Sequence, residues 1–130
     1  MATPYKVGPT IGLVTETFMV GTKAAPLVDA DKGKAVKLAD GSRAELGAAT
    51  DEILGFLTSV EPGTKAGFKI GGLQMDGFAL VDTGDAAVGD LVVVDTNPAS
   101  GTAGLTKVKT ATGTPKLRWM VMHPGVIRKV

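Results

Sequence analysis

The sequence predicts an all-β protein, a small β-barrel or sandwich with an extended N-terminal arm. Turn residues, mainly Gly, Pro and Asp, recur at short intervals along the chain, and helix signals are almost absent. Between the turns lie short runs rich in valine, isoleucine and threonine, which fit a half-buried pleated surface. Many short strands joined by glycine turns are typical of small barrels and sandwiches.

One sequence pattern, a turn glycine followed by a buried strand, occurs twice in the chain. Residues 31–40 and 86–95 both pass through a Gly and a polar residue into an apolar run that ends at an Asp. Gly33 and Gly89 supply the positive φ that such a turn needs, and the run after each predicts a short buried strand. The repetition favours a module built from two related halves.

The chain before residue 31 is predicted to be extended. Pro4, Pro9 and Pro26 interrupt any helix, and residues 11–20 are rich in Thr and β-branched side chains. We therefore expect an extended N-terminal arm at residues 1–30 and a single β-barrel domain at residues 31–130. The alternative is that this stretch supplies an ordinary first strand of the same barrel.

Turn residues also delimit the later strands. Asp40-Gly41-Ser42 is a strong turn between strands at 34–38 and 43–46. Residues 49–57 are ambiguous, because Thr50 can cap a short helix, but Gly55 favours a turn into a strand. Further strands are predicted at 68–73, 77–82, 91–95, 105–109, 117–122 and 126–130, with loops at 97–104 and 110–115.

Composition limits how the fold is held together. The chain has 130 residues and no cysteine, so one modest core must stabilise it without disulfides or thiolate metal sites. No apolar run approaches the roughly 18 residues of a membrane span, and prolines interrupt the N-terminus where a signal peptide needs an apolar run. We expect a soluble protein, made in the cytoplasm, with no membrane partner.

Charge is unevenly distributed, although the net charge is only +1. Residues 40–95 carry ten acidic and three basic side chains, whereas residues 96–130 carry six basic side chains and no acidic one. One interpretation is that strands interleave and the charges average out; the other is that the basic part contacts an acidic neighbouring surface. Nucleic acid is disfavoured as a partner, because the basic positions are dispersed and only one Trp and one Tyr are present to stack on bases.

Three local patterns resemble catalytic or cofactor sites. Asp82-Thr83-Gly84 is similar to the signature of retroviral-type aspartic proteases, in which two subunits each supply one Asp, but the glycine-rich segment precedes the Asp instead of following it. The segment Gly71-Gly72-Leu73-Gln74-Met75 is similar to the hairpin tip of a biotinyl or lipoyl carrier domain, with Gln74 where the modified Lys belongs. The single histidine, His123, has no thiolate or acid nearby to complete a common zinc site. We therefore expect no catalytic residue, cofactor or metal.

Four pieces of the chain follow one another in the order found in a known family. They are Gly33-Lys34-Ala35-Val36-Lys37-Leu38, Ala49-Thr50 with Ile53-Leu54-Gly55-Phe56, Met75-Asp76-Gly77-Phe78-Ala79-Leu80-Val81, and Ala87-Val88-Gly89-Asp90-Leu91-Val92-Val93-Val94-Asp95. In this order and spacing they resemble the capsid cement, or head-decoration, proteins of tailed bacteriophages.

The resemblance implies a structural virion protein that binds the outer surface of an assembled capsid and stabilises it. Its partners are then the major capsid protein and further copies of itself, in a dimer or trimer. Its location is the outer capsid surface, after synthesis in the host cytoplasm. Two other classes stay open: a dimeric aspartic protease that uses Asp82, and a non-viral β-barrel binding module.

Two groups of residues are candidates for an interface. The apolar side chains of an extended arm are poorly placed to stay solvated, so we expect them on a neighbouring subunit or on the shell. In the basic C-terminal part, Trp119 beside Arg118 is typical of an interface anchor, although a Trp equally suits the centre of a barrel core. The candidates are Ile11, Leu13, Phe18, Met19, Lys116, Arg118, Trp119 and Arg128.

Overall fold

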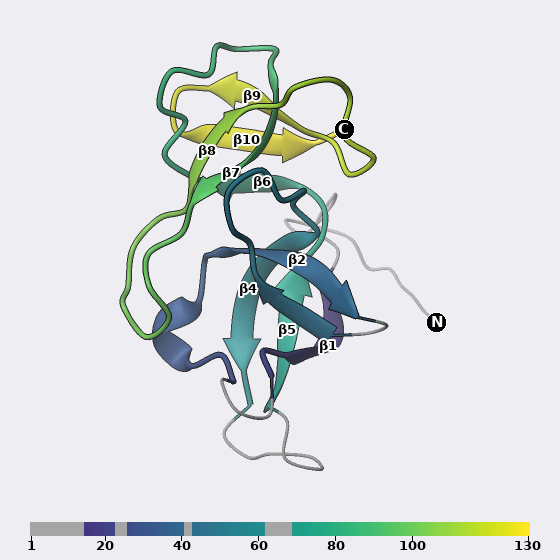
Figure 1. Ribbon diagram of the computed structural model, residues 1–130, viewed down its shortest axis with the longest axis vertical. Coiled ribbons are helices and arrows are strands. Elements are labelled where there is room, and N and C mark those ends of the chain that lie inside the picture. The colour runs from purple at the N-terminus through teal and green to yellow at the C-terminus, as the bar shows by residue number, and fades with distance from the viewer. Residues whose placement is uncertain (1–14, 23–25, 41–42, 62–68) are drawn as a thin grey trace, which may run out of the picture.

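The computed structural model describes residues 15–22, 26–40, 43–61 and 69–130. Within these ranges the chain forms ten strands and one short 3-10 helix, with no α-helix, so the all-β prediction is confirmed (Figure 1). The elements are β1 (Thr15–Val20), η2 (Asp29–Asp31), β2 (Ala35–Asp40), β3 (Arg43–Leu46), β4 (Gly55–Val60), β5 (Lys69–Gln74), β6 (Phe78–Leu80), β7 (Leu91–Thr96), β8 (Lys107–Thr110), β9 (Trp119–His123) and β10 (Val126–Lys129).

The first five strands pair in the order β1-β3-β2-β4-β5 and form a closed barrel. Closure comes from β5, which pairs with β4 on one side and with β1 on the other. Strands β1 and β3 run parallel and the other pairs run antiparallel. A closed ring leaves none of these strands as an edge. Seven buried apolar residues fill its interior: Val20, Leu27, Val36, Ala44, Leu54, Leu57 and Leu73.

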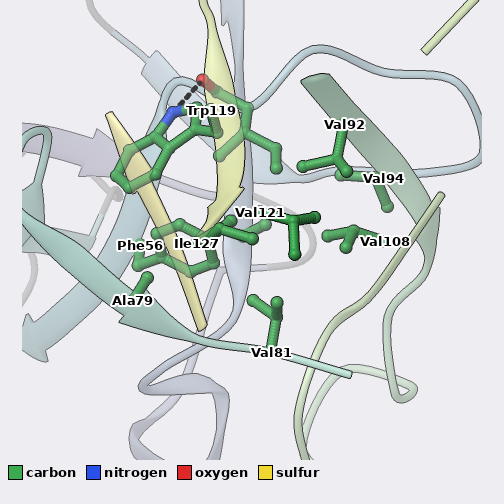
Figure 2. Packing of buried hydrophobic residues seen from close by; sticks show 11 residues of the cluster. Phe56, Ala79, Val81, Val92, Val94, Val108, Trp119, Val121 and Ile127 are labelled. Atoms are coloured by element: carbon green, nitrogen blue, oxygen red, sulfur yellow. Dashed lines mark hydrogen bonds between the residues drawn. The ribbon is translucent and has the colours of Figure 1, made fainter. Parts of the chain in front are cut away.

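The last five strands form a second sheet in the order β6-β10-β9-β7-β8. Its two edges meet at an isolated parallel bridge between Asp82, which follows β6, and Lys107, the first residue of β8. The inner face of this sheet is a second core, which the barrel completes with Ala35, Ile53 and Phe56 (Figure 2). The two units lie one above the other along the long axis of the molecule (Figure 1).

Trp119 lies in this second core. Its side chain is fully buried, and its ring meets the Phe56 ring edge-on, with centroids 5.1 Å apart. The indole Nε1–H donates a 3.1 Å hydrogen bond to the carbonyl oxygen of Ile53, drawn as the dashed line in Figure 2. A buried indole needs such a partner for its one polar group. Trp119 therefore packs a strand of the second sheet directly onto the barrel.

The structure differs from the predicted division into arm and barrel. Residues 15–20 form β1, and each of them has a partner in β5. Farther along, Leu27 is buried in the barrel core. Val20 and Leu27 fill space inside the ring, so this stretch supplies the first strand and part of the core. The barrel thus begins at Thr15 instead of residue 31, and the strands after residue 77 form a sheet of their own instead of continuing it.

The turn-and-strand pattern that occurs twice in the sequence is confirmed as a turn before a strand. Gly33 precedes β2 with a φ of 89°, and Gly89 precedes β7 with a φ of 94°. The ambiguous stretch at 49–57 is a turn followed by β4, which begins at Gly55. Local turn chemistry therefore predicted these strand starts correctly.

A buried ion pair joins the two units. Asp31 and Lys34 are both wholly inaccessible to solvent, and the Lys34 Nζ lies 2.6 Å from Asp31 Oδ1. Lys34 Nζ also donates to the carbonyl oxygen of Ala99, and Asp31 accepts hydrogen bonds from the Gly101 amide and the Ser100 hydroxyl. These five residues, named here the Asp31–Lys34 clamp, hold the loop between β7 and β8 against the barrel (Figure 1).

A second set of hydrogen bonds joins the base of the same loop to the barrel. The Asn97 side-chain amide donates to the carbonyl oxygens of Ala35 and Gly47, at 3.1 Å and 2.7 Å. The buried Thr106 hydroxyl accepts from the Ala35 amide and donates to Asn97 Oδ1. Buried polar groups satisfied in this way specify one arrangement, because any other leaves them without partners.

The clamp changes the acidity of Asp31. Burial by itself raises the pKa of this carboxyl, but the hydrogen bonds from Lys34, Val28 and Gly101, together with the Lys34 charge, outweigh it. The pKa of Asp31 therefore lies below its usual 3.8. Because the folded-state value is the lower one, the carboxylate contributes stability above pH 3.8, and this contribution is lost as the pH falls through the folded-state pKa.

Removing the Trp119 side chain is expected to destabilise the isolated protein. Trp119→Ala leaves a cavity in the second core and should lower the free energy of unfolding by about 3–5 kcal/mol. Trp119→Phe keeps most of the packing and loses the hydrogen bond to Ile53, so its cost should be smaller. Denaturant unfolding of the purified chain measures both. A Trp119→Ala protein as stable as the parent would contradict the core assignment.

Removing one member of the clamp is expected to cost far more than breaking a surface pair. Lys34→Met leaves the buried Asp31 carboxylate without its counter-charge and should lower the free energy of unfolding by about 3–5 kcal/mol. Lys32→Met is the matched control, because Lys32 pairs with Asp29 at 3.3 Å with both side chains exposed. Its cost should stay below about 1 kcal/mol.

Acid should narrow the difference in stability between the parent chain and Lys34→Met. Once Asp31 is protonated, it no longer needs the Lys34 charge, so the gap should shrink as the pH falls toward the folded-state pKa of Asp31 in the parent chain, which lies below 3.8. Urea unfolding across that pH range measures the gap. A gap of constant size would show that the Asp31 charge is not what Lys34 stabilises.

Candidate functional site

The second sheet carries an apolar face that points away from its core. Along β6 the side chains alternate, with Ala79 buried and Phe78 and Leu80 exposed by 59% and 68%. Along β9, Trp119 and Val121 are buried, whereas Met120 and Met122 lie on the opposite side. We name this surface the outer face; it consists of Phe78, Leu80, Leu91, Met120, Met122, Val126 and Arg128.

Strand register places the outer-face residues side by side. Arg128 lies opposite Phe78 on one neighbouring strand and opposite Met120 on the other, and Met120 lies opposite Leu91. These four residues form one row across β6, β10, β9 and β7. Directly opposite residues of antiparallel strands project from the same face, with Cβ atoms about 5 Å apart. The row is therefore a continuous surface instead of scattered apolar side chains.

Arg128 supplies the charge of the outer face. Its guanidinium carbon lies 5.6 Å from the centre of the Phe78 ring, within the range of a cation–π contact. Arg118 precedes β9, and its carbonyl oxygen accepts a hydrogen bond from the Val130 amide. Both arginines are exposed, and neither forms an ion pair with another described residue. An apolar surface with unpaired guanidinium groups suits a partner that is apolar at its centre and acidic at its rim.

The predicted interface residues are only partly brought together. Arg118 and Arg128 lie on the second sheet, and Lys116 is exposed in the loop before it. Trp119 is in the core, so the core alternative holds and its side chain is not available to a partner. Phe18 and Met19 are half-buried in β1, with Phe18 packed against the barrel core. Ile11 and Leu13 lie outside the described residues.

The uneven charge of the sequence is partly averaged by strand pairing. The Nζ atom of Lys107, in the basic C-terminal part, lies 3.9 Å from Oδ2 of Asp95, in the acidic middle part, because β8 pairs with β7. The outer-face arginine is not neutralised in this way. The interleaving interpretation therefore holds for Lys107, whereas Arg118 and Arg128 form no ion pair with another described residue.

The residues that resembled catalytic motifs hold turns together. The exposed Asp82 accepts a hydrogen bond from the Gly84 amide through Oδ1, and the buried Thr83 hydroxyl accepts one from the Gly125 amide. Gln74 uses its side-chain amide to bind the carbonyl oxygens of Asp76 and Phe78. Within the described ranges, no group of three His, Asp or Glu side chains is placed to hold a metal ion.

Comparison with known protein families, with curated proteins and with solved structures finds no match to this chain. Among the described residues, no helix has both the length and the apolar character to cross a membrane. The site is therefore defined by its geometry alone.

The turn before β7 is expected to be structural. Gly89 has a φ of 94° with open space around it, so Gly89→Val should cost about 1–3 kcal/mol through backbone strain alone. Asp90 Oδ2 accepts hydrogen bonds from the Ala87 amide and the Thr110 hydroxyl, and Asp90→Asn keeps an acceptor oxygen there. Thermal unfolding of both variants should rank Gly89→Val as the more damaging. The opposite ranking would contradict this assignment.

Proposed function

We propose that this protein is a structural binding protein that attaches to the outer surface of an assembled bacteriophage capsid and stabilises it. The outer face is the observation that supports the proposal most directly. Exposed contiguous apolar surface is uncommon on proteins that act alone and is typical of interaction sites. The sequence resemblance to capsid cement proteins adds the kind of partner, which is the major capsid protein in its assembled form.

The outer face has the composition of an interface. It combines a Phe, two Met residues and an Arg, which are enriched in protein interfaces, and it holds no lysine or acid. A single face of this kind binds modestly. A homodimer or trimer that presents two or three such faces to a shell multiplies that affinity, because the later contacts form at high effective concentration. We therefore propose a homo-oligomer on the outer capsid surface.

The proposal is tested by co-sedimentation of the purified protein with expanded empty phage shells. Saturable binding to shells, and none to the soluble major capsid protein, is expected. Met122→Asp and Arg128→Glu place acid on the outer face and should each weaken binding about tenfold or more, equivalent to at least about 1.4 kcal/mol. Rising salt should weaken the parent chain more than Arg128→Glu, because exposed charges are screened.

The matched control is Leu38→Asp, which changes an exposed leucine of the barrel strand β2. It should bind shells like the parent chain. Two results would contradict the proposal: no binding to any expanded shell, or equal binding by the parent and both outer-face variants. Binding to soluble proteins alone would favour the non-viral binding module instead.

A further inference from the structure

A groove lies beside β6, one of the two edge strands of the second sheet. It has a volume of about 340 Å³. Its walls are the edge strand β6 and Leu105, which precedes β8, and its floor includes Phe56 and Thr58 of β4. Gln74, the last residue of β5, lines one end. The groove therefore runs between the barrel and the second sheet.

The backbone of β6 faces this groove with hydrogen-bonding groups. The Gly77 carbonyl oxygen accepts a hydrogen bond from the Lys129 amide, and the Val81 amide donates one to the Gly125 carbonyl oxygen. The backbone amides and carbonyls of the odd-numbered residues of this segment therefore point toward β10. The backbone amides and carbonyls of Phe78 and Leu80 point away from β10, toward the groove. The Phe78 carbonyl accepts the Gln74 amide at 2.6 Å, which closes that end.

At the other end of the edge, the Asp82 amide donates to the carbonyl oxygen of Thr106. Between these two closed ends, the amide and carbonyl of Leu80 face the groove. A strand edge of this kind pairs readily with an added extended segment. The walls around it are apolar and exposed, with Leu80 at 68% and Leu105 at 56%.

We infer that the groove binds the N-terminal segment of the same chain, residues 5–13, as an extended strand along β6. In this segment the odd positions are apolar and the even positions are polar or small. The odd positions are Tyr5, Val7, Pro9, Ile11 and Leu13, and the even ones are Lys6, Gly8, Thr10 and Gly12. This alternation places one apolar side against the groove and the other side toward solvent. Pro9 is compatible with such a strand, since proline is tolerated at a sheet edge.

The start of β1 places this segment beside the groove. Thr15 lies directly opposite Gln74, the residue that lines the end of the groove and binds the Phe78 carbonyl. Residues 5–14 are therefore attached next to their binding site, and an extended segment of that length reaches about 30 Å. A short tether gives an effective concentration in the millimolar range, so binding within one chain outcompetes binding between chains at micromolar protein. This inference does not rest on capsid binding.

Disulfide trapping in the full-length chain tests the inference, because the native sequence has no cysteine. Ile11→Cys is combined with Leu105→Cys at the groove, or with Leu38→Cys on the barrel as the control. Both partner positions are exposed, so neither substitution disturbs a core. Under mild oxidation, the Leu105 pair should form an intramolecular disulfide at least about tenfold faster than the Leu38 pair, since only the docked segment keeps its thiol near the groove.

Two further variants separate docking from mere proximity. Moving the first cysteine to an even position, with Gly12→Cys, should slow trapping, because that position faces solvent. Adding Leu80→Asp to the Ile11 and Leu105 pair should slow it as well, while circular dichroism reports an unchanged fold. Equal rates for the Leu105 and Leu38 pairs would overturn the inference. Disulfide-linked dimers as the main product at low micromolar protein would also overturn it, because they would place the segment on a second copy.

Discussion

A lysine and an aspartate buried side by side hold the loop between β7 and β8 against the barrel, and the relative position of the two sheets depends on that loop. Neither charge has access to water, so each is stable there only while the other is present and the surrounding donors and acceptors are in place. Asp31 reaches the Ser100 hydroxyl and the Gly101 amide, and Lys34 reaches the Ala99 carbonyl. Displacing the loop therefore removes hydrogen-bond partners of both buried charges at once.

The shared core enforces the same arrangement by a different force. The second sheet closes only at the bridge between Asp82 and Lys107, and the barrel fills the remaining space with Phe56, Ile53 and Ala35. The two sheets pack against each other through this core and leave two apolar surfaces exposed. These are the outer face around Arg128 and the groove along β6. The outer face lies on the second sheet, and the groove runs between that sheet and the barrel, so the barrel both supports the sheet and supplies the floor of the groove.

Local features of this fold were predictable from the sequence, and long-range ones were not. Gly33, Gly55 and Gly89 start strands as their turn chemistry indicates, because a positive φ or a strand break depends on neighbouring residues only. The arm was misjudged because residues 15–20 carry no sign that β5 pairs with them. From the sequence alone, Lys34 is expected on the surface, because its partner Ala99 lies 65 positions away along the chain.

The outer face was predictable only in part. Arg128 was identified from its charge, but Phe78 and Leu80 were not, because they alternate with the equally apolar Ala79 and Val81. A strand that is apolar on both sides gives no indication of which side faces solvent. Trp119 fits both a core and an interface from sequence alone, and the Phe56 ring beside it decides for the core.

Native-state hydrogen exchange tests most directly whether the clamp and the shared core make one cooperative unit. The Leu57 amide lies in the barrel, where it donates to the Lys34 carbonyl, and the Val121 amide lies in the second sheet, where it donates to the Asp90 carbonyl. If the two sheets open only together, both amides exchange through the same global unfolding, with free energies equal within about 1 kcal/mol. A Val121 amide that exchanges through an opening several kcal/mol below that of Leu57 would show that the second sheet unfolds on its own, and would contradict this account.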